Sequence, residues 1–169
     1  RLMVVRLNLA YTNDDKNLVG IDVASAHREK FLANRYHNKI FKNVVGYVWG
    51  LQYLEGKGGY YHHVFLFLDC ETQPDDSWHA SISDYWSSIT DGKGRCQNYD
   101  KGVLNYIYPG VGLVNRCQAD DFIEKAASFL TMKELFFSLK YGNSEEKFRT
   151  YGKGKVPPKF HLYAGHQPN

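Results

Sequence analysis

The stretch Gly56–Asp69, with the sequence GKGGYYHHVFLFLD, is a glycine-rich turn that leads into a hydrophobic strand. The apolar run before it, Val44–Leu54, predicts a partner strand, and the glycines between the two runs indicate a β-hairpin. Two histidines stand at the entrance of the second strand, and Gln52 lies near the end of the first. If the strands pair, Gln52 and His63 can face each other.

Neighbouring residues of a strand point to opposite faces of a sheet, so His62 and His63 are not expected to bind one metal ion together. Imidazole on a rigid strand is a plausible ligand for a divalent metal, and it is equally a group that forms structural hydrogen bonds. Gln52 occupies an apolar strand face, where a polar side chain requires a partner. The residues alone therefore leave a metal site and a structural histidine as alternatives.

The rest of the chain predicts an α+β domain. Leu2–Tyr11 alternates as a strand does, Ser25–Phe41 has helical spacing, and a capped helix follows Asp75. A fourth strand is expected over Tyr106–Val114, and a helix over Asp120–Lys140. This order predicts an antiparallel sheet with helices packed on it, close to a ferredoxin-like arrangement.

Size and composition favour one folded domain over residues 1–169. The chain has 169 residues and is 43% hydrophobic and 15% aromatic, which suits a single core rather than disorder. No run reaches the ~18 apolar residues of a membrane span. Three widely spaced cysteines without a CxxC pair favour a reducing cytoplasm over a disulfide framework.

The C-terminal third is basic, although the net charge of the chain is only +3. A glycine- and proline-rich tail, irregular in expectation, begins at about residue 150. Such a segment could lie along nucleic-acid phosphates, or it could be an ordinary solvated surface. The basic residues considered for DNA contact are Lys140, Arg149, Lys153 and Lys155.

One face of the predicted Asp120–Lys140 helix carries Phe129 and Lys133, four residues apart. Most of the apolar stripe on this helix is expected to be core. Lys133 could orient or neutralise a phosphate beside the sheet, or it could extend into solvent.

Several motifs together resemble the replication initiators of filamentous phages and their prophage and satellite relatives, within the HUH endonuclease superfamily. The motifs are the opening strand VVRLNL, the hairpin GYVWGLQY with GYYHHVFLFLD, the helix end YW followed by TDGKG, FLTMK at 129–133 and RTYGKG at 149–154. The resemblance implies an HUH-type sheet and a bacterial host cytoplasm. It also implies that the domain nicks and rejoins single-stranded or hairpin origin DNA, with the replication machinery as a further partner.

The resemblance implies Mg²⁺ or Mn²⁺ held by a His-x-His pair and a third polar residue, and a tyrosine that attacks the scissile phosphate. The His-x-His falls on Tyr61 and His63, with His62 between them, and the third ligand falls on Gln52. The metal position is thus assigned to His63 and Gln52, with either Tyr61 or His62 completing it. Lys133 matches the assisting lysine, whereas the nucleophile falls on Phe129, which has no hydroxyl.

Three explanations for Phe129 stay open. It could be a deliberate change from Tyr, or the domain could be a degenerate relative that binds DNA without cutting it. Alternatively, another tyrosine, such as Tyr141 or Tyr151, could be the nucleophile. A different class of function is an RNA-binding domain, which would need solvent-facing aromatics such as Phe65 and Phe67 on the central strands.

Overall fold

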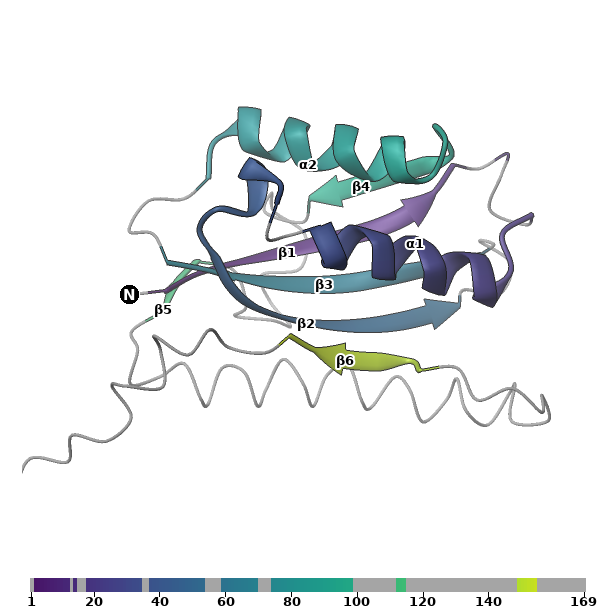
Figure 1. Cartoon of the computed structure of the whole chain (residues 1–169), viewed down its shortest axis with the longest axis horizontal. Helices are drawn as coiled ribbons and strands as arrows, with labels where there is room; N and C mark the ends of the chain where they lie inside the picture. Colours follow the sequence, from purple (N-terminus) through teal and green to yellow (C-terminus); the bar gives the residue numbers. More distant parts are fainter. Residues whose placement is uncertain are drawn as a thin grey trace, which may run out of the picture.

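The computed structural model describes residues 2–12, 14, 18–34, 37–53, 59–69, 74–98, 112–114 and 149–154 (Figure 1). The elements in chain order are β1 (Leu2–Tyr11), α1 (Ile21–Ala33), the short 3₁₀ helix η2 (Lys39–Phe41), β2 (Val44–Tyr53), β3 (Tyr60–Leu68), α2 (Asp76–Ile89), β4 (Gly94–Asn98), β5 (Gly112–Val114) and β6 (Tyr151–Lys153). This confirms the predicted α+β class, the strand at Leu2–Tyr11 and the β2–β3 hairpin.

All strand pairs of the sheet are antiparallel. The order is β4-β1-β3-β2-β6, and β5 pairs with the first residues of β1 beyond the end of β4. β1 and β3 therefore occupy the centre, and β4 and β6 lie at the edges. The predicted antiparallel sheet is confirmed.

The core fills the space between the sheet and the two helices, which cover the same face of the sheet (Figure 1). Alternate residues of each strand supply this face, because the side-chain period of a strand is two residues. The fully buried members with the largest side chains include Leu7, Leu9 and Leu66 from the sheet and Phe31, Ile82 and Trp86 from the helices. The part of the chain that the structure describes has no helix long and apolar enough to cross a bilayer.

Helix α2 follows the sequence prediction closely. The Asp75 side chain accepts a hydrogen bond from the Trp78 backbone N–H at 2.9 Å and caps the helix. Ile82, Trp86 and Ile89 are buried as the apolar stripe predicts. The indole of Trp86 also donates to the Ala10 carbonyl at 2.9 Å, so the helix is tied to β1 by a directional bond.

The predicted helix over residues 25–41 is wrong at both ends, since α1 spans Ile21–Ala33. Asn34 ends the helix, and its carbonyl accepts hydrogen bonds from the backbone N–H groups of His37 and Asn38. The Asn38 side chain then caps η2 through the Ile40 N–H at 3.1 Å. Two asparagines thus divide one helical pattern into a helix and a separate 3₁₀ turn.

Two edge strands were not predicted. β4 follows the tight turn after α2, where Asp91 and Gly92 have φ of 53° and 81°. The irregular tail expected from about residue 150 is wrong for Tyr151–Lys153, which forms β6 against β2. Of the strand expected over Tyr106–Val114, only Gly112–Val114 is described, and the helix expected over Asp120–Lys140 lies outside the described residues.

The glycines around β6 allow it to pack closely on β2. A Cβ added to Gly152 would lie 2.7 Å from the Trp49 indole nitrogen, and one added to Gly154 would collide with the Tyr47 ring. The Leu51 N–H donates to the Thr150 carbonyl at 2.7 Å and the Gly154 N–H donates to the Tyr47 carbonyl at 3.0 Å. The glycines that suggested an irregular tail are therefore what allows a strand here.

We expect Gly152→Ala to lower the free energy of unfolding by about 1–3 kcal/mol, because the added methyl overpacks against Trp49. Urea denaturation would measure this loss, and amide hydrogen exchange would show faster exchange at Leu51. Lys153→Ala, at an exposed position of the same strand, is the matched control and should change stability by no more than ~0.5 kcal/mol. Equal stability of Gly152→Ala and the wild type would contradict this packing.

Candidate functional site

The face of the sheet opposite the helices, which we call the second face, carries a row of polar side chains across its centre. Register and alternation place Arg6, Gln52, Tyr61 and His63 on it. Gln52 pairs with Tyr61, and His63 pairs with Gly50 on one side and with Asn8 on the other. The predicted meeting of Gln52 and His63 is therefore observed.

Four of these side chains form one hydrogen-bonded chain. Arg6 Nη2 lies 3.2 Å from His63 Nδ1, and His63 Nε2 lies 3.0 Å from Gln52 Oε1. The Tyr61 hydroxyl donates to the same Gln52 oxygen. Arg6 and His63 are buried, at 5% and 3% exposure, whereas Gln52 and Tyr61 are partly exposed. The chain thus runs from the interior of the sheet toward its accessible end.

The direction of the hydrogen bonds fixes the tautomer of His63. A guanidinium can only donate, so His63 Nδ1 accepts from Arg6 and carries no proton. The proton of the neutral ring then lies on Nε2, which donates to Gln52 Oε1. The Gln52 oxygen accepts two hydrogen bonds, one from His63 and one from Tyr61. Each of these three hydrogen bonds therefore joins one donor to one acceptor.

This arrangement does not suit the Mg²⁺ or Mn²⁺ that the resemblance implies. The His63 nitrogen nearest Gln52 holds a proton instead of a lone pair, and the phenol and amide beside it are neutral. Hard divalent cations favour carboxylate oxygens, and none of the three side chains supplies one. Within the described ranges, no three His, Cys, Asp or Glu side chains gather as a metal group.

His62 does not join this group, because it lies on the helix face, and its assignment beside His63 as a metal ligand is corrected. Its Nε2 lies 3.0 Å from the Ala24 carbonyl, and its ring makes edge contacts with Trp49 and Trp86. The side chain is fully buried. Burial, helped by the nearby Arg28 charge, lowers the pKa of His62 to about 3. His62 is therefore a neutral structural histidine.

The basic residues proposed for DNA contact are described only in part. Arg149 and Lys153 are exposed, at the start and end of the segment that contains β6, and Lys153 projects on the second face. Phe129, Lys133, Lys140 and Lys155 lie outside the described residues, as does Tyr141. The convergence expected of Lys133 with His63 and Gln52 stays a prediction.

Sequence reasoning did not find Arg6. Arg6 is buried, and its guanidinium lies 5.7 Å from the Phe65 ring centre. β1 is a central strand with neighbours along both edges, and its pairing with β3 places Arg6 beside Phe65. Arg6 orients His63 and is the residue that determines its tautomer.

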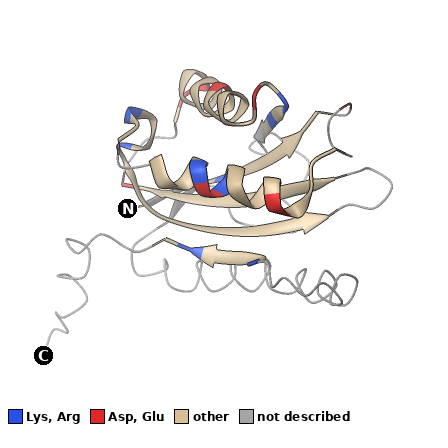
Figure 2. Cartoon of the chain, turned by 45° about the vertical axis from the view of Figure 1, so that its right-hand side comes forward, with Lys and Arg blue, Asp and Glu red and all other residues tan. Residues whose placement is uncertain are grey.

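Charge is distributed unequally between the sheet and the helices (Figure 2). None of the six described strands contains Asp or Glu, whereas Arg6, Arg95 and Lys153 lie within them. Acidic residues of the described elements lie on α1 and α2, at Asp22, Glu29, Asp76 and Asp84. The second face therefore presents cations without acidic neighbours from its own strands.

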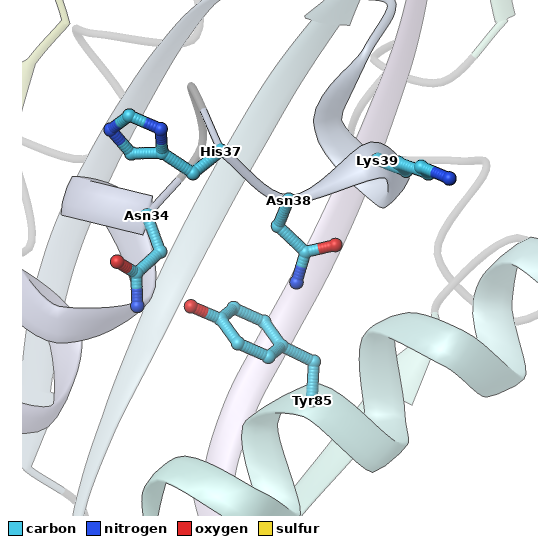
Figure 3. A pocket seen from close by; sticks show the side chains of 5 residues that line it. All are labelled: Asn34, His37, Asn38, Lys39 and Tyr85. Atoms are coloured by element: carbon cyan, nitrogen blue, oxygen red, sulfur yellow. The ribbon is translucent and has the colours of Figure 1, made fainter.

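A separate pocket of about 450 Å³ lies on the helix side, lined by Asn34, His37, Asn38, Lys39 and Tyr85 (Figure 3). The buried Tyr85 hydroxyl has no hydrogen-bond partner among the described residues. In Figure 3, the Asn34 and Asn38 amides lie on either side of the Tyr85 ring, while the Lys39 chain points away from it. The pocket is formed by α2 and the α1–η2 connection, so it is separate from the His63 group.

No protein-family model, no curated protein and no solved structure matches this chain. The function must therefore be argued from the site alone.

The depressed pKa of His62 predicts a loss of stability in acid. The unfolded histidine takes up a proton below its ordinary pKa of about 6.5, whereas the folded one does not until about pH 3. Stability is thus full above pH 6.5 and falls as the pH is lowered. One such group lowers the free energy of unfolding by about 2 kcal/mol between pH 7 and pH 5. Urea denaturation at a series of pH values would measure this slope, which His62→Phe should reduce and the exposed His37→Asn should leave unchanged.

The tautomer of His63 can be observed directly. Long-range ¹H–¹⁵N correlation spectra should show its proton on Nε2. Added Mn²⁺ should broaden the His63 signals no more than those of the exposed His37. A proton on Nδ1, or selective broadening at His63, would contradict the hydrogen-bond chain described above.

Proposed function

We propose that this domain binds single-stranded or hairpin DNA through the second face of its sheet, as a catalytically degenerate relative of HUH-type replication initiators. The observation that carries the proposal is the hydrogen-bond chain from Arg6 through His63 to Gln52 and Tyr61. The resemblance assigns the metal group to His63, Gln52 and Tyr61, and in this structure their polar atoms are hydrogen-bonded to one another. In this proposal the partly exposed end of the group, Gln52 and Tyr61, contacts nucleotides, and the group is not a metal centre.

Charge supports an anionic partner for this face. Lys153 and Arg95 are exposed there, and the described strands contribute no carboxylate that would repel a phosphate. Lys140, Arg149 and Lys155 extend the proposed phosphate contacts. A single strand is favoured over a duplex because polar and aromatic side chains on a sheet can meet unpaired bases. Bacterial cytoplasm and the replication machinery belong to the same proposal.

A second candidate is the nicking and rejoining of origin DNA. The observation in its favour is that His63, Gln52 and Tyr61 meet at one point, as the resemblance implies. It requires a hydroxyl nucleophile in place of Phe129 and a different protonation of His63. Lys133 would contact the scissile phosphate in this candidate.

The RNA-binding alternative has less support. It requires exposed aromatics on the central strands, and Phe65 and Phe67 are only 2% and 6% exposed. We therefore treat RNA as a competitor in the binding assay below.

The proposal predicts measurable binding of fluorescein-labelled single-stranded or hairpin DNA by anisotropy, weaker binding of matched duplex and RNA, and a Kd that rises with salt. Lys153→Ala should weaken binding, since it removes a phosphate contact, whereas Lys39→Ala on the helix side should not. On a denaturing gel with Mn²⁺, the wild type should form no covalent protein–DNA band. A covalent band from Phe129→Tyr alone would favour a blocked nicking enzyme, and no binding to any of these nucleic acids would refute the proposed function.

A further inference from the structure

Among the described Phe, Tyr and Trp residues, which are otherwise buried or partly buried, Tyr151 is the one that is largely exposed, at 51%. It lies on an edge strand instead of in a loop, so its backbone position is defined by the sheet. Tyrosine combines a large apolar ring with a polar hydroxyl, which is why it is enriched at interfaces.

Tyr151 projects on the second face, in line with the His63 group. It pairs with Gly50, which in turn pairs with His63 on β3. Gly50 contributes no side chain to this row, so no side chain of β2 stands between Tyr151 and His63. Two strand spacings of ~4.8 Å separate the backbones of Tyr151 and His63. This backbone separation is comparable to the length of one nucleotide, so a single nucleotide could contact both Tyr151 and the hydrogen-bonded group of His63.

Lys153 lies on the same face as Tyr151, two residues along β6 and opposite Val48. The rise of a strand separates the two residues by ~6.8 Å. This separation is comparable to that between the base and the phosphate of one nucleotide. The alternate residues, Gly152 and Gly154, face the aromatic rings of Trp49 and Tyr47 on the other side. The segment Tyr151–Gly154 thus keeps its side chains on the second face and its glycines against the core.

The position of β6 is fixed from the helix side as well. Arg28 is buried at 3% exposure, its guanidinium carbon lies 3.7 Å from the Trp49 ring centre, and its Nη1 donates to the Arg149 carbonyl at 3.4 Å. Trp49 in turn lies under Gly152. A buried cation therefore holds the chain that enters β6, which limits the entropy lost when Tyr151 contacts a ligand.

We propose that Tyr151 and Lys153 form a nucleotide-binding strip on β6, in which the Tyr151 ring stacks on an unpaired base and the Lys153 ammonium contacts the adjoining phosphate. The inference rests on the proposed function, since it names how the same face holds single-stranded DNA. Stacking is tolerant of sequence because every base has a π-face. The role assigned to Tyr151 uses its ring and not its hydroxyl.

The test compares the affinities of four variants for a fluorescein-labelled single-stranded oligonucleotide by anisotropy at several salt concentrations. Tyr151→Ala should raise Kd roughly 5- to 150-fold, which corresponds to the ~1–3 kcal/mol of one stacked base, and should leave the salt slope unchanged. Tyr151→Phe should stay within about twofold of the wild type. Lys153→Ala should raise Kd and reduce the slope of log K against log salt by ~0.7. Leu18→Ala, at a residue 77% exposed, is the matched control and should have no effect.

A second readout does not depend on affinity. An oligonucleotide that contains 5-iodouracil should crosslink to Tyr151 under ultraviolet light, with the site identified by mass spectrometry, and Tyr151→Ala should abolish that adduct. If the wild type binds the oligonucleotide and Tyr151→Ala binds it with the same affinity, the strip is overturned and the proposed function stands. An equal loss in Tyr151→Phe and Tyr151→Ala would also overturn it, because the hydroxyl would then be the essential group. Absence of wild-type binding would refute both proposals together.

Discussion

The two-residue period of β3 is the constraint on which the rest of the structure depends. It sends two neighbouring histidines into different chemical environments. His62 is enclosed between the sheet and the helices, where removal from water keeps it neutral. His63 lies on the second face, where a buried guanidinium selects its tautomer. A shift of one residue in the register would exchange these environments and place an unpaired imidazole in the core.

The sequence was sufficient to predict the parts whose structure is determined locally. The β2–β3 hairpin, the Asp75 cap and the Ile82–Trp86–Ile89 stripe follow from turn chemistry and periodicity within short windows. β6 could not be predicted in this way, because its three residues become a strand only against Trp49 and Tyr47, which are distant in sequence. The prediction of one helix across residue 34 was wrong because of local hydrogen bonds. The hydrophobic spacing continues past Asn34, but the Asn34 carbonyl and the Asn38 side chain accept bonds that end the helix there.

The candidate site shows a similar division. The approach of Gln52 to His63 could be predicted because the two residues lie on the paired strands of one hairpin. The hydrogen bond from Arg6 to His63 could not, because Arg6 lies on β1, a third strand far away in the sequence. The resemblance implies a histidine at position 61 and an acid at position 52, whereas the chain has Tyr61 and Gln52. A neutral phenol and a neutral amide suit this position, because the Gln52 oxygen accepts hydrogen bonds from both Tyr61 and His63. The protonated Nε2 of His63 needs a hydrogen-bond acceptor, and the Gln52 oxygen can serve because it does not bind a cation as well.

The long separation in sequence between β2 and its edge partner has a consequence for synthesis of the protein on the ribosome. Among the described strands, the neighbour of the outer edge of β2 is β6, which can pair there only after the chain has been translated through Lys153 and that segment has left the exit tunnel. Until then, the N–H and C=O groups near Trp49 and Leu51 form an open template to which another nascent chain can add. A truncated product that ends before β6 would leave this edge of β2 without its β6 partner and so more prone to aggregation.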